Sequence, residues 1–335
     1  MLLSDIVTVK IIVPHYPIDT REKEDWFKIC ADTAGGEIVS VQNKNTFEVI
    51  KNVSGKNIHA HGRGFPFPEL SCLFAKRSIY TPHFNTLGSR WWTKIARSFI
   101  WNRYTKIIAQ TRFGKRSYIE SGVKPEKIEV LPIPIDYDFW SKPKGGDAFR
   151  KKYKLGKEPF AICIGIRKGK NVDVIAEACR KAGIKLVAVG FKDKNEIRPG
   201  IEFMLPPKEY MKFDNVIYTG FISSKELLAA LDAASIFINS SESSFECFCV
   251  SAYQAAAAGV PLCLPDFGVF ESFKGRALFH NNHDPDQLAE NIKTYLKNKR
   301  LASENIAAAR KIAASVDYLV VRKMFEDFYK SIFVS

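Results

Sequence analysis

The chain has 335 residues and a formal net charge of +14, from 50 lysines and arginines against 36 aspartates and glutamates. This length suits two domains, and no apolar run approaches the roughly 18 residues of a membrane-spanning helix, which argues against an integral membrane protein. The start, MLLSDIVTVKIIVPHYP, lacks the pattern of an export signal. Seven cysteines, an odd number in apolar surroundings, favour buried thiols in a reducing compartment. We therefore expect a cytoplasmic protein.

The first 136 residues alternate between strand-like and helix-like segments. Runs of β-branched and apolar residues predict strands at 7–14, 36–42, 57–62, 78–84, 105–111 and 127–136. Helical spacing of apolar residues predicts helices at 22–31, 45–53, 89–104 and 112–122. Strands that alternate with helices predict a parallel sheet with helical crossovers.

A charged segment with Pro143 and Gly145-Gly146, residues 136–159, is the best candidate for a linker. The alternation then restarts, with strands predicted at 160–166, 185–190, 215–221, 235–241 and 261–266. Helices are predicted at 171–183, 223–234, 251–259 and 284–298, followed by a helical tail over 304–333. The fold class is therefore α/β, with two units whose strand ends offer ligand sites.

A basic turn follows the first strand of the second unit. Gly165, Arg167 and Lys170 stand between this strand and the next helix. Cations beside a helix N-terminus make a good diphosphate site, because free backbone N–H groups and the helix dipole add to their charge. On the local sequence alone, a solvated basic turn fits equally well.

Residues Ser240–Asp266 read SSESSFECFCVSAYQAAAAGVPLCLPD and combine a polar loop with a helix of small residues. The loop carries Glu246, and the helix predicted around Ser251–Ala258 carries Gln254 on its first turns. A loop acid before a helix N-terminus can meet a bound ligand together with the free N–H groups. A solvated loop acid explains Glu246 as well, and Glu242 is the second candidate for the role.

The order of these motifs resembles a known family. The segments IGIRKGKNVDVIAEA, LVAVG and NVIYTGFISSKELLAALDAASIFINSS precede Glu246, and Cys247-Phe248-Cys249, Gln254 and Gly259-Val260-Pro261 follow it. In the first half, IHAHG, YTPH and KIIAQTRFGKRSYIESGVKPEKIEVLPIPID occur in the family's order. The chain thus resembles the retaining GT-B glycosyltransferases of family 4, the glycosyl transferases group 1.

This resemblance implies two Rossmann-like domains that face each other across a cleft. Residues 1–140 would form the acceptor domain and 141–316 the nucleotide-sugar donor domain, with a C-terminal helix at about 317–335 packing back on the first. The family moves a sugar from a UDP- or GDP-linked donor to an acceptor hydroxyl of a glycan or lipid-linked saccharide. It does so with retention of anomeric configuration and without a metal or another cofactor.

The resemblance also implies roles for single residues. Gln254 stands where the family has a second glutamate, so it keeps an acceptor oxygen for ribose hydroxyls but carries no charge. Cys247 and Cys249 replace two glycines of the family motif. His59 and His61 are easily confused with the family's histidine at position 83. The catalytic residues would be Glu246 and His83, and the donor-binding residues Gly165, Arg167, Lys170, Phe248, Cys249, Val250, Ser251 and Gln254.

A stretch without acidic residues runs from Leu70 to Ile119. Within the helix predicted there, one face combines cations with aromatic residues and would suit an anionic membrane surface: Arg90, Lys94, Arg97, Trp101 and Tyr104. The other face, expected to pack on the sheet, consists of Trp92, Ile95, Ala96, Phe99 and Ile100. A solvated basic face is an equally good interpretation.

Three other functions stay open at this point. A nucleotide-sugar epimerase can share the two-Rossmann architecture, although it needs acid and base groups around the sugar. The positive charge also allows a nucleic-acid-binding protein, whose affinity would fall steeply with salt. We expect no nucleic acid partner, and Gln254 leaves room for a catalytically weakened homologue.

Overall fold

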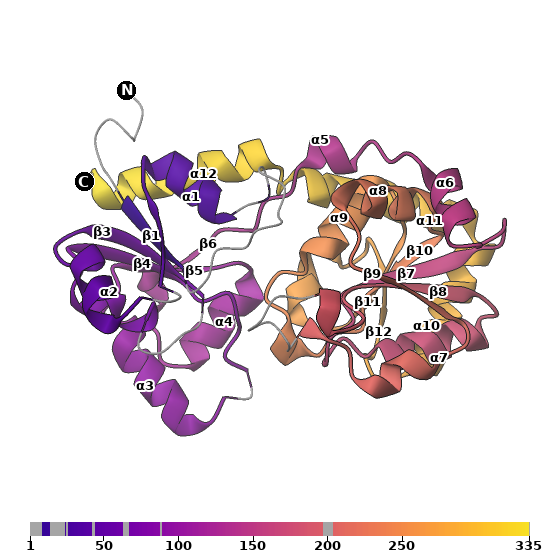
Figure 1. The fold of residues 1–335 in the computed structure, drawn as a ribbon, viewed down its shortest axis with the longest axis horizontal. Coiled ribbons are helices and arrows are strands. Elements are labelled where there is room, and N and C mark those ends of the chain that lie inside the picture. Colours follow the sequence, from indigo (N-terminus) through magenta and orange to yellow (C-terminus); the bar gives the residue numbers. More distant parts are fainter. Residues whose placement is uncertain are drawn as a thin grey trace. The chain divides into compact units, whose positions relative to one another are not determined.

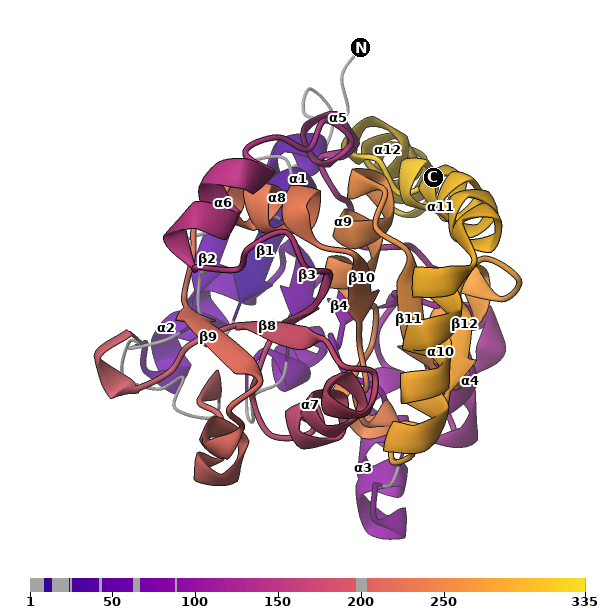
Figure 2. The same cartoon turned by 90° about the vertical axis from the view of Figure 1, so that its right-hand side faces the viewer.

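The computed structural model describes residues 9–13, 24, 26–41, 44–62, 67–87, 89–196 and 204–334. The strand predicted at 7–14 and the helix predicted at 22–31 therefore lie partly outside the described residues. Contacts divide the chain into two units, each with its own sheet (Figures 1 and 2). Unit 1 comprises Met1–Asp136, Glu246–Phe248 and Val316–Ser335, and unit 2 comprises Tyr137–Phe245 and Cys249–Ser315.

Unit 1 contains a parallel six-stranded sheet in the order β2-β1-β3-β4-β5-β6. The strands are β1 (Val9–Val13), β2 (Ile38–Ser40), β3 (Asn57–His61), β4 (Arg77–Thr81), β5 (Lys106–Ala109) and β6 (Ile128–Val130). The helices are α1 (Trp26–Ala34), α2 (Thr46–Val53), α3 (Trp91–Trp101), α4 (Arg112–Glu120) and α12 (Tyr318–Phe333), with short 3₁₀ helices η3 (Glu69–Leu73) and η4 (Pro125–Lys127).

Helices cover both faces of this sheet, as a parallel sheet requires. Helices α1 and α12 pack together on one face, and α2, α3 and α4 lie on the other (Figure 1). The C-terminal helix α12 contributes Phe325 and Tyr329, both fully buried. Helix α2 begins with a capping box in which Asn45 and Glu48 each accept a hydrogen bond from the other's backbone N–H.

Unit 2 contains a second parallel six-stranded sheet, in the order β12-β11-β10-β7-β8-β9. The strands are β7 (Phe160–Ile164), β8 (Lys185–Val189), β9 (Val216–Gly220), β10 (Ile236–Ile238), β11 (Leu262–Pro265) and β12 (Leu278–His280). The helices are α5 (Tyr137–Trp140), α6 (Gly146–Lys152), α7 (Val172–Lys181), α8 (Ser224–Ala233), α9 (Val250–Ala258), α10 (Pro285–Lys297) and α11 (Lys299–Ala314), with 3₁₀ helices η5 (Lys194–Glu196), η7 (Lys208–Lys212), η8 (Ser243–Phe245) and η9 (Gly268–Phe273).

The two parallel sheets with crossover helices confirm the α/β prediction. Burial explains why these strand sequences are apolar, because residues of β7, β8 and β10 such as Ala161, Leu186 and Ile236 are fully buried. Strand β12 was not predicted from the sequence. None of the helices in the described part of the chain is long and apolar enough to cross a membrane.

The segment expected to be a linker, residues 136–159, is instead packed. Helix α5 lies against α9, and α6 lies against α8. Trp140 and Phe149 are buried, and the Gly146 N–H donates to the Asp232 carboxylate at 2.8 Å. The glycines that suggested flexibility serve close packing, because a Cβ on Gly146 would lie 2.9 Å from Asp232 Oδ2.

Helix α3 presents the opposite face from the one predicted. Trp101 and Tyr104, assigned to a membrane-facing surface, are completely buried. Trp101 lies between Tyr80, at 5.4 Å between ring centroids, and Tyr118, at 5.2 Å. Four of the five residues predicted to pack on the sheet are exposed instead, namely Trp92, Ile95, Ala96 and Phe99, whereas Ile100 is half-buried and packs against the core as predicted. The membrane face expected through Arg90, Lys94, Arg97, Trp101 and Tyr104 is therefore wrong as a set.

Candidate donor-binding site

The order of strands in unit 2 reverses between β7 and β10. The chain runs from β7 outward to β8 and β9, and then returns to β10 on the other side of β7. Because β7 and β10 are parallel neighbours, with Ala161 opposite Ile236, the loops that follow them leave the same edge of the sheet. Open α/β sheets bind ligands at such switch points. The residues after β7 and β10 therefore form the candidate site.

The loop after β7 is the basic turn predicted from the sequence. Gly165 has a φ of +86°, a conformation that favours glycine, and its N–H donates to the Val189 carbonyl at 2.7 Å. A Cβ at this position would lie 3.3 Å from Lys170 Cε, so glycine lets the lysine stem cross the backbone. The structure thus brings Gly165 and Lys170 into contact.

The loop after β10 packs on this turn. Arg167 donates from Nη2 to the Phe245 carbonyl at 3.2 Å, and its guanidinium lies 5.5 Å from the centroid of the Phe245 ring. Gly169, at a φ of +80°, faces the same ring, because a Cβ there would be 2.5 Å from Phe245 Cδ2. Phe245 is partly exposed beside these contacts. Apart from its place in the loop, no feature of the sequence pointed to this aromatic residue.

Asn171 connects three loops of the site. It precedes α7 in a left-handed conformation, with a φ of +48°, and its side chain is almost fully buried. Its amide nitrogen lies 3.0 Å from the Ser240 carbonyl, 3.1 Å from Glu242 Oε1 and 3.3 Å from the Asn282 carbonyl. These acceptors follow β10 and β12, so the amide holds both loops against the turn after β7.

The two loop acids have different surroundings. Glu242 lies 3.0 Å from His283 Nε2 and also accepts from Asn171 and from Asn282 Nδ2, at 3.3 Å. Its N–H donates to the Gly169 carbonyl at 2.8 Å. These contacts account for Glu242 as a structural residue of the loop.

Glu246 itself is buried, and the segment Glu246–Phe248 is grouped with unit 1. The Glu246 carbonyl accepts a hydrogen bond from Asn85 Nδ2 at 2.7 Å, and the Cys247 carbonyl accepts one from Thr111 at 3.4 Å. Phe248 is also buried. The sequence offered no sign that three residues between β10 and α9 pack with the first sheet.

Helix α9 begins directly after this segment. Cys249 precedes it at a φ of +34°, which explains why the family motif has glycine here. The Cys249 sulfur lies 3.3 Å from Asn239 Nδ2 and 3.5 Å from the Ser251 hydroxyl. Cys249 does not cap the helix with its side chain. Gln254 lies half-buried on the second turn, whereas the alanines of α9 are buried, so that the helix packs closely on its neighbours.

His83 forms the centre of a hydrogen-bonded group in unit 1. It follows β4 at a φ of +59°, with Nε2 at 3.0 Å from His61 Nδ1 and Nδ1 at 3.3 Å from Gln110 Nε2. If the Gln110 amide donates to Nδ1, the proton of His83 lies on Nε2 and points to His61. Burial lowers the pKa of His83 to about 4, so the ring is neutral at pH 7.

The other two histidines of this group are structural. His59 is fully buried between the Tyr329 hydroxyl, at 2.6 Å, and the Thr81 hydroxyl, at 2.7 Å. His61 is equally buried, and its ring packs against that of His59 in a tilted arrangement, with 3.9 Å between ring centroids. Burial lowers the pKa of both imidazoles well below its usual value. Only His83 lies beyond the end of its strand, which separates it from the two residues confused with it in the sequence.

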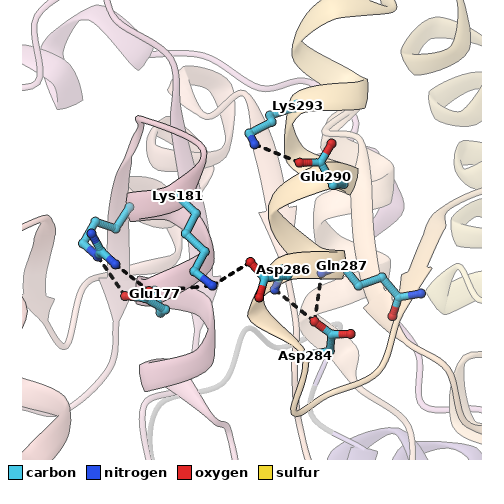
Figure 3. A network of polar contacts seen from close by, with 8 residues as sticks. Glu177, Lys181, Asp284, Asp286, Gln287, Glu290 and Lys293 are labelled. Atoms are coloured by element: carbon cyan, nitrogen blue, oxygen red, sulfur yellow. Dashed lines mark hydrogen bonds and ion pairs between the residues drawn. The ribbon is translucent and has the colours of Figure 1, made fainter.

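Among the described residues, two sets of side chains carry groups of the kind that bind metal ions. Cys30, His59 and His61 bring their ligand atoms within 4.8 Å of one another, but both ring nitrogens of His59 already bond hydroxyl groups. The pair Asp284 and Asp286 offers carboxylates, yet Asp284 caps α10 and Asp286 pairs with Lys181 at 2.6 Å (Figure 3). Both sets thus have partners that a metal would have to displace.

Comparison with protein families decides the classification. The model described as Glycosyl transferases group 1 matches residues 146–312, and the model described as Glycosyltransferase Family 4 matches residues 49–139. The chain belongs to this family of glycosyltransferases. The resemblance inferred from the sequence motifs is thereby confirmed. No curated protein sequence gives a significant match to this glycosyltransferase.

Solved structures share the fold of this glycosyltransferase. HepE of Anabaena, solved with UDP and glucose, superposes with a TM-score of 0.73 at 13% identity and covers 97% of this chain and 100% of its own. A glycosyltransferase from Rickettsia africae superposes with a TM-score of 0.72 at 16% identity, and the match covers 97% of this chain and 98% of the Rickettsia chain. Sucrose-phosphate synthase of Thermosynechococcus elongatus superposes with a TM-score of 0.72 at 14% identity, and the match covers 98% of this chain and 99% of the synthase. These likenesses show the GT-B fold that the motifs implied.

The structure sorts the ten predicted site residues by unit. Gly165, Arg167 and Lys170 lie in unit 2 after β7. Cys249, Val250, Ser251 and Gln254 lie in the same unit, at the start of α9. His83, Glu246 and Phe248 belong to unit 1. Sequence reasoning missed Phe245 as part of the site. It placed Asn171 in the motif IGIRKGKNVDVIAEA but assigned it no role, and its side chain binds the loops after β10 and β12 and does not cap α7.

Proposed function

We propose that the glycosyltransferase moves a sugar from a nucleoside diphosphate sugar, linked to UDP or GDP, to a hydroxyl group of a glycan or lipid-linked saccharide. The observation that carries this proposal is the basic turn Gly165–Lys170 beside β10 at the switch point of unit 2. The UDP-bound neighbours favour UDP over GDP. In this proposal residues 141–316 bind the donor and residues 1–140 bind the acceptor.

The basic turn suits the diphosphate. Arg167 and Lys170 supply two positive charges, and the N-terminus of α7 begins within the same loop. Hydrogen bonds between a guanidinium and phosphate oxygens are charge-assisted and geometrically specific. The start of α9, with Val250 and Ser251, adds backbone N–H groups, and Gln254 would accept from the ribose hydroxyls.

We infer transfer with retention of anomeric configuration. The bond from the anomeric carbon to the phosphate oxygen breaks, and the acceptor oxygen attacks on the same face. The proton of the acceptor hydroxyl passes to the departing phosphate, so no protein nucleophile is needed. Arg167 and Lys170 would stabilise the charge on the leaving diphosphate, and Glu246 would face the positively charged sugar. Positioning and electrostatics carry the catalysis.

His83 has a more limited role in this mechanism. Because burial lowers the pKa of His83 to about 4, its ring is neutral at pH 7 and offers no positive charge to stabilise the transition state. We assign it a role in orienting the sugar. Metal independence is also part of the proposal, and the EDTA comparison described next tests it. A cytoplasmic enzyme at the inner face of a membrane would meet a lipid-linked acceptor there.

The experiment compares donor turnover by Glu246→Gln and by the wild type. UDP-glucose and GDP-mannose are incubated with each protein, and proton NMR follows the anomer that forms first, with and without EDTA. We expect turnover with retention, unaffected by EDTA, and a loss of roughly a hundredfold in Glu246→Gln. An inverted first product would refute retention, a loss of activity with EDTA would refute metal independence, and near-normal turnover by the variant would refute the role of Glu246.

A further inference from the structure

Helix α3 of unit 1 turns a row of large apolar side chains to solvent. Trp91, Trp92, Ile95 and Phe99, hereafter the α3 stripe, expose 73%, 51%, 61% and 68% of their surface. Their spacing along the helix places them on one side of it. Exposed single apolar residues are ordinary, but a contiguous aromatic patch marks an interaction surface.

The packing of α3 keeps the stripe outside. At the C-terminal end of the helix, Trp101 is completely buried beside Tyr80 and Tyr118. On the inner side, the Arg97 guanidinium lies 5.2 Å from the Phe84 ring and donates to the Ser89 hydroxyl at 2.7 Å. The helix therefore buries part of a cationic side chain and exposes its aromatic residues. Rotating the stripe inward would break the Trp101 contacts.

Positively charged residues flank the stripe at both ends. Arg90 and Arg103 are exposed at its two ends, and the Arg103 guanidinium lies 5.1 Å from the Phe99 ring. The stretch from Leu70 to Ile119 contains ten lysines and arginines and no acidic residue. Figure 2 shows α3 projecting from the other helices of unit 1. Aromatic and aliphatic side chains between cations are the composition of helices that lie in the membrane interface.

We propose that the α3 stripe, flanked by Arg90 and Arg103, docks this protein on an anionic lipid surface. The apolar side chains enter the boundary between headgroups and acyl chains, where tryptophan is favoured. The arginines stay at the level of the headgroups and pair with lipid phosphates. This surface differs from the one predicted from the sequence, because Trp101 and Tyr104 are in the core, and it does not depend on which sugar the enzyme transfers.

Two features of the stripe argue against a second copy of the chain as its occupant. In a two-fold dimer the stripe would meet itself, and the arginines around it would face one another as like charges. The four side chains expose on the order of 500 Å², below the roughly 800 Å² per partner of a stable protein interface. A lipid surface has no such minimum area and supplies the opposite charge.

Vesicle co-sedimentation tests the proposal, with phosphatidylcholine vesicles and with vesicles that also contain phosphatidylglycerol, at low salt. The wild type should sediment only with the anionic vesicles and be released as salt screens the charges. The double variant Trp91→Ser/Phe99→Ser should bind at least roughly tenfold more weakly. Arg90→Gln/Arg103→Gln should lower the affinity for anionic vesicles roughly thirtyfold, since each cation near the surface contributes to attachment.

The matched control is Phe47→Ser, because Phe47 is the most exposed phenylalanine of the described residues and lies on α2 of the same unit. This variant should bind vesicles like the wild type. A thermal melt checks that each variant is folded, and the blue shift of tryptophan fluorescence on adding vesicles reports insertion of the stripe in the wild type directly. The proposal is overturned if the wild type ignores anionic vesicles, if the serine variant binds as well as the Phe47→Ser control, or if size-exclusion chromatography shows that the stripe instead pairs two copies.

Discussion

The substitution Asn171→Ala tests whether one buried amide holds the donor-binding loops together. The Asn171 amide nitrogen has two hydrogens for three acceptors, at 3.0, 3.1 and 3.3 Å. One acceptor is the Glu242 carboxylate, and another is the Ser240 carbonyl, in a buried part of the loop. Alanine removes both donors and must also adopt a φ of +48°.

The loss in the free energy of unfolding can be built from these contacts. Leaving a buried acceptor without its donor costs about 1–3 kcal/mol. Forcing alanine into the left-handed region adds about 1 kcal/mol, since asparagine tolerates it better. We therefore expect Asn171→Ala to lower the free energy of unfolding of unit 2 by about 3 kcal/mol. Asn171→Gly removes the amide but accepts the backbone conformation, so its loss should be about 1 kcal/mol smaller.

Urea unfolding followed by circular dichroism measures these differences, with Asn195→Ala as the control, because Asn195 is an exposed residue of the same unit. The control should stay within about 0.5 kcal/mol of the wild type. If Asn171→Ala lowers the free energy of unfolding no more than the Asn195→Ala control does, the Asn171 amide does not hold the loops together. A larger loss for Asn171→Gly than for Asn171→Ala would refute the contribution of the backbone conformation.

Three further substitutions probe unit 2. Burial lowers the pKa of His280 to about 4 from 6.5, so the unfolded chain binds more protons between these values, and the free energy of unfolding should fall as pH drops through this window. The free energy of unfolding lost to His280 over this window is on the order of 3 kcal/mol. His280→Gln should therefore flatten the pH profile of urea unfolding, and an unchanged profile would contradict this. Gly169→Ala should displace the Phe245 ring and weaken nucleoside diphosphate binding at least roughly tenfold in calorimetry, whereas wild-type affinity would show that the ring moves freely. Gln254→Glu should bind the nucleoside diphosphate at least as tightly as the wild type, because a carboxylate accepts stronger hydrogen bonds from ribose; a large loss of affinity would place Gln254 away from the ribose.

The sequence sufficed for the fold class because strand and helix periods differ. Parallel strands buried on both faces read as apolar runs, and the runs around Ile162 and Val187 lie in the core as predicted. The sequence did not suffice for residues 136–159, where Pro143 and Gly145-Gly146 suggested a flexible linker although the segment is packed. Trp140 and Phe149 anchor that segment in unit 2 through residues far away in the sequence.

Helix α3 shows the limit of periodicity most clearly. Its pattern has two apolar faces, one with Trp92 and Phe99 and one with Trp101, and a helical period cannot tell which of them meets the core. The aromatic partners of Trp101 come from β4 and α4 and decide the matter. For the same reason the contacts of Asn171 escaped prediction, since two of its acceptors lie 69 and 111 residues away.

Isothermal titration shows whether the basic turn of unit 2 binds a diphosphate. UDP, GDP and the matching nucleosides are titrated into the wild type, Arg167→Ala and the control Arg180→Ala, whose exposed arginine pairs with Glu177 on α7. We predict that UDP or GDP binds the wild type, that Arg167→Ala weakens the diphosphate at least roughly tenfold while hardly affecting the nucleoside, and that Arg180→Ala changes neither. If neither diphosphate binds, or if Arg167→Ala weakens diphosphate and nucleoside equally, the donor site is not at this turn.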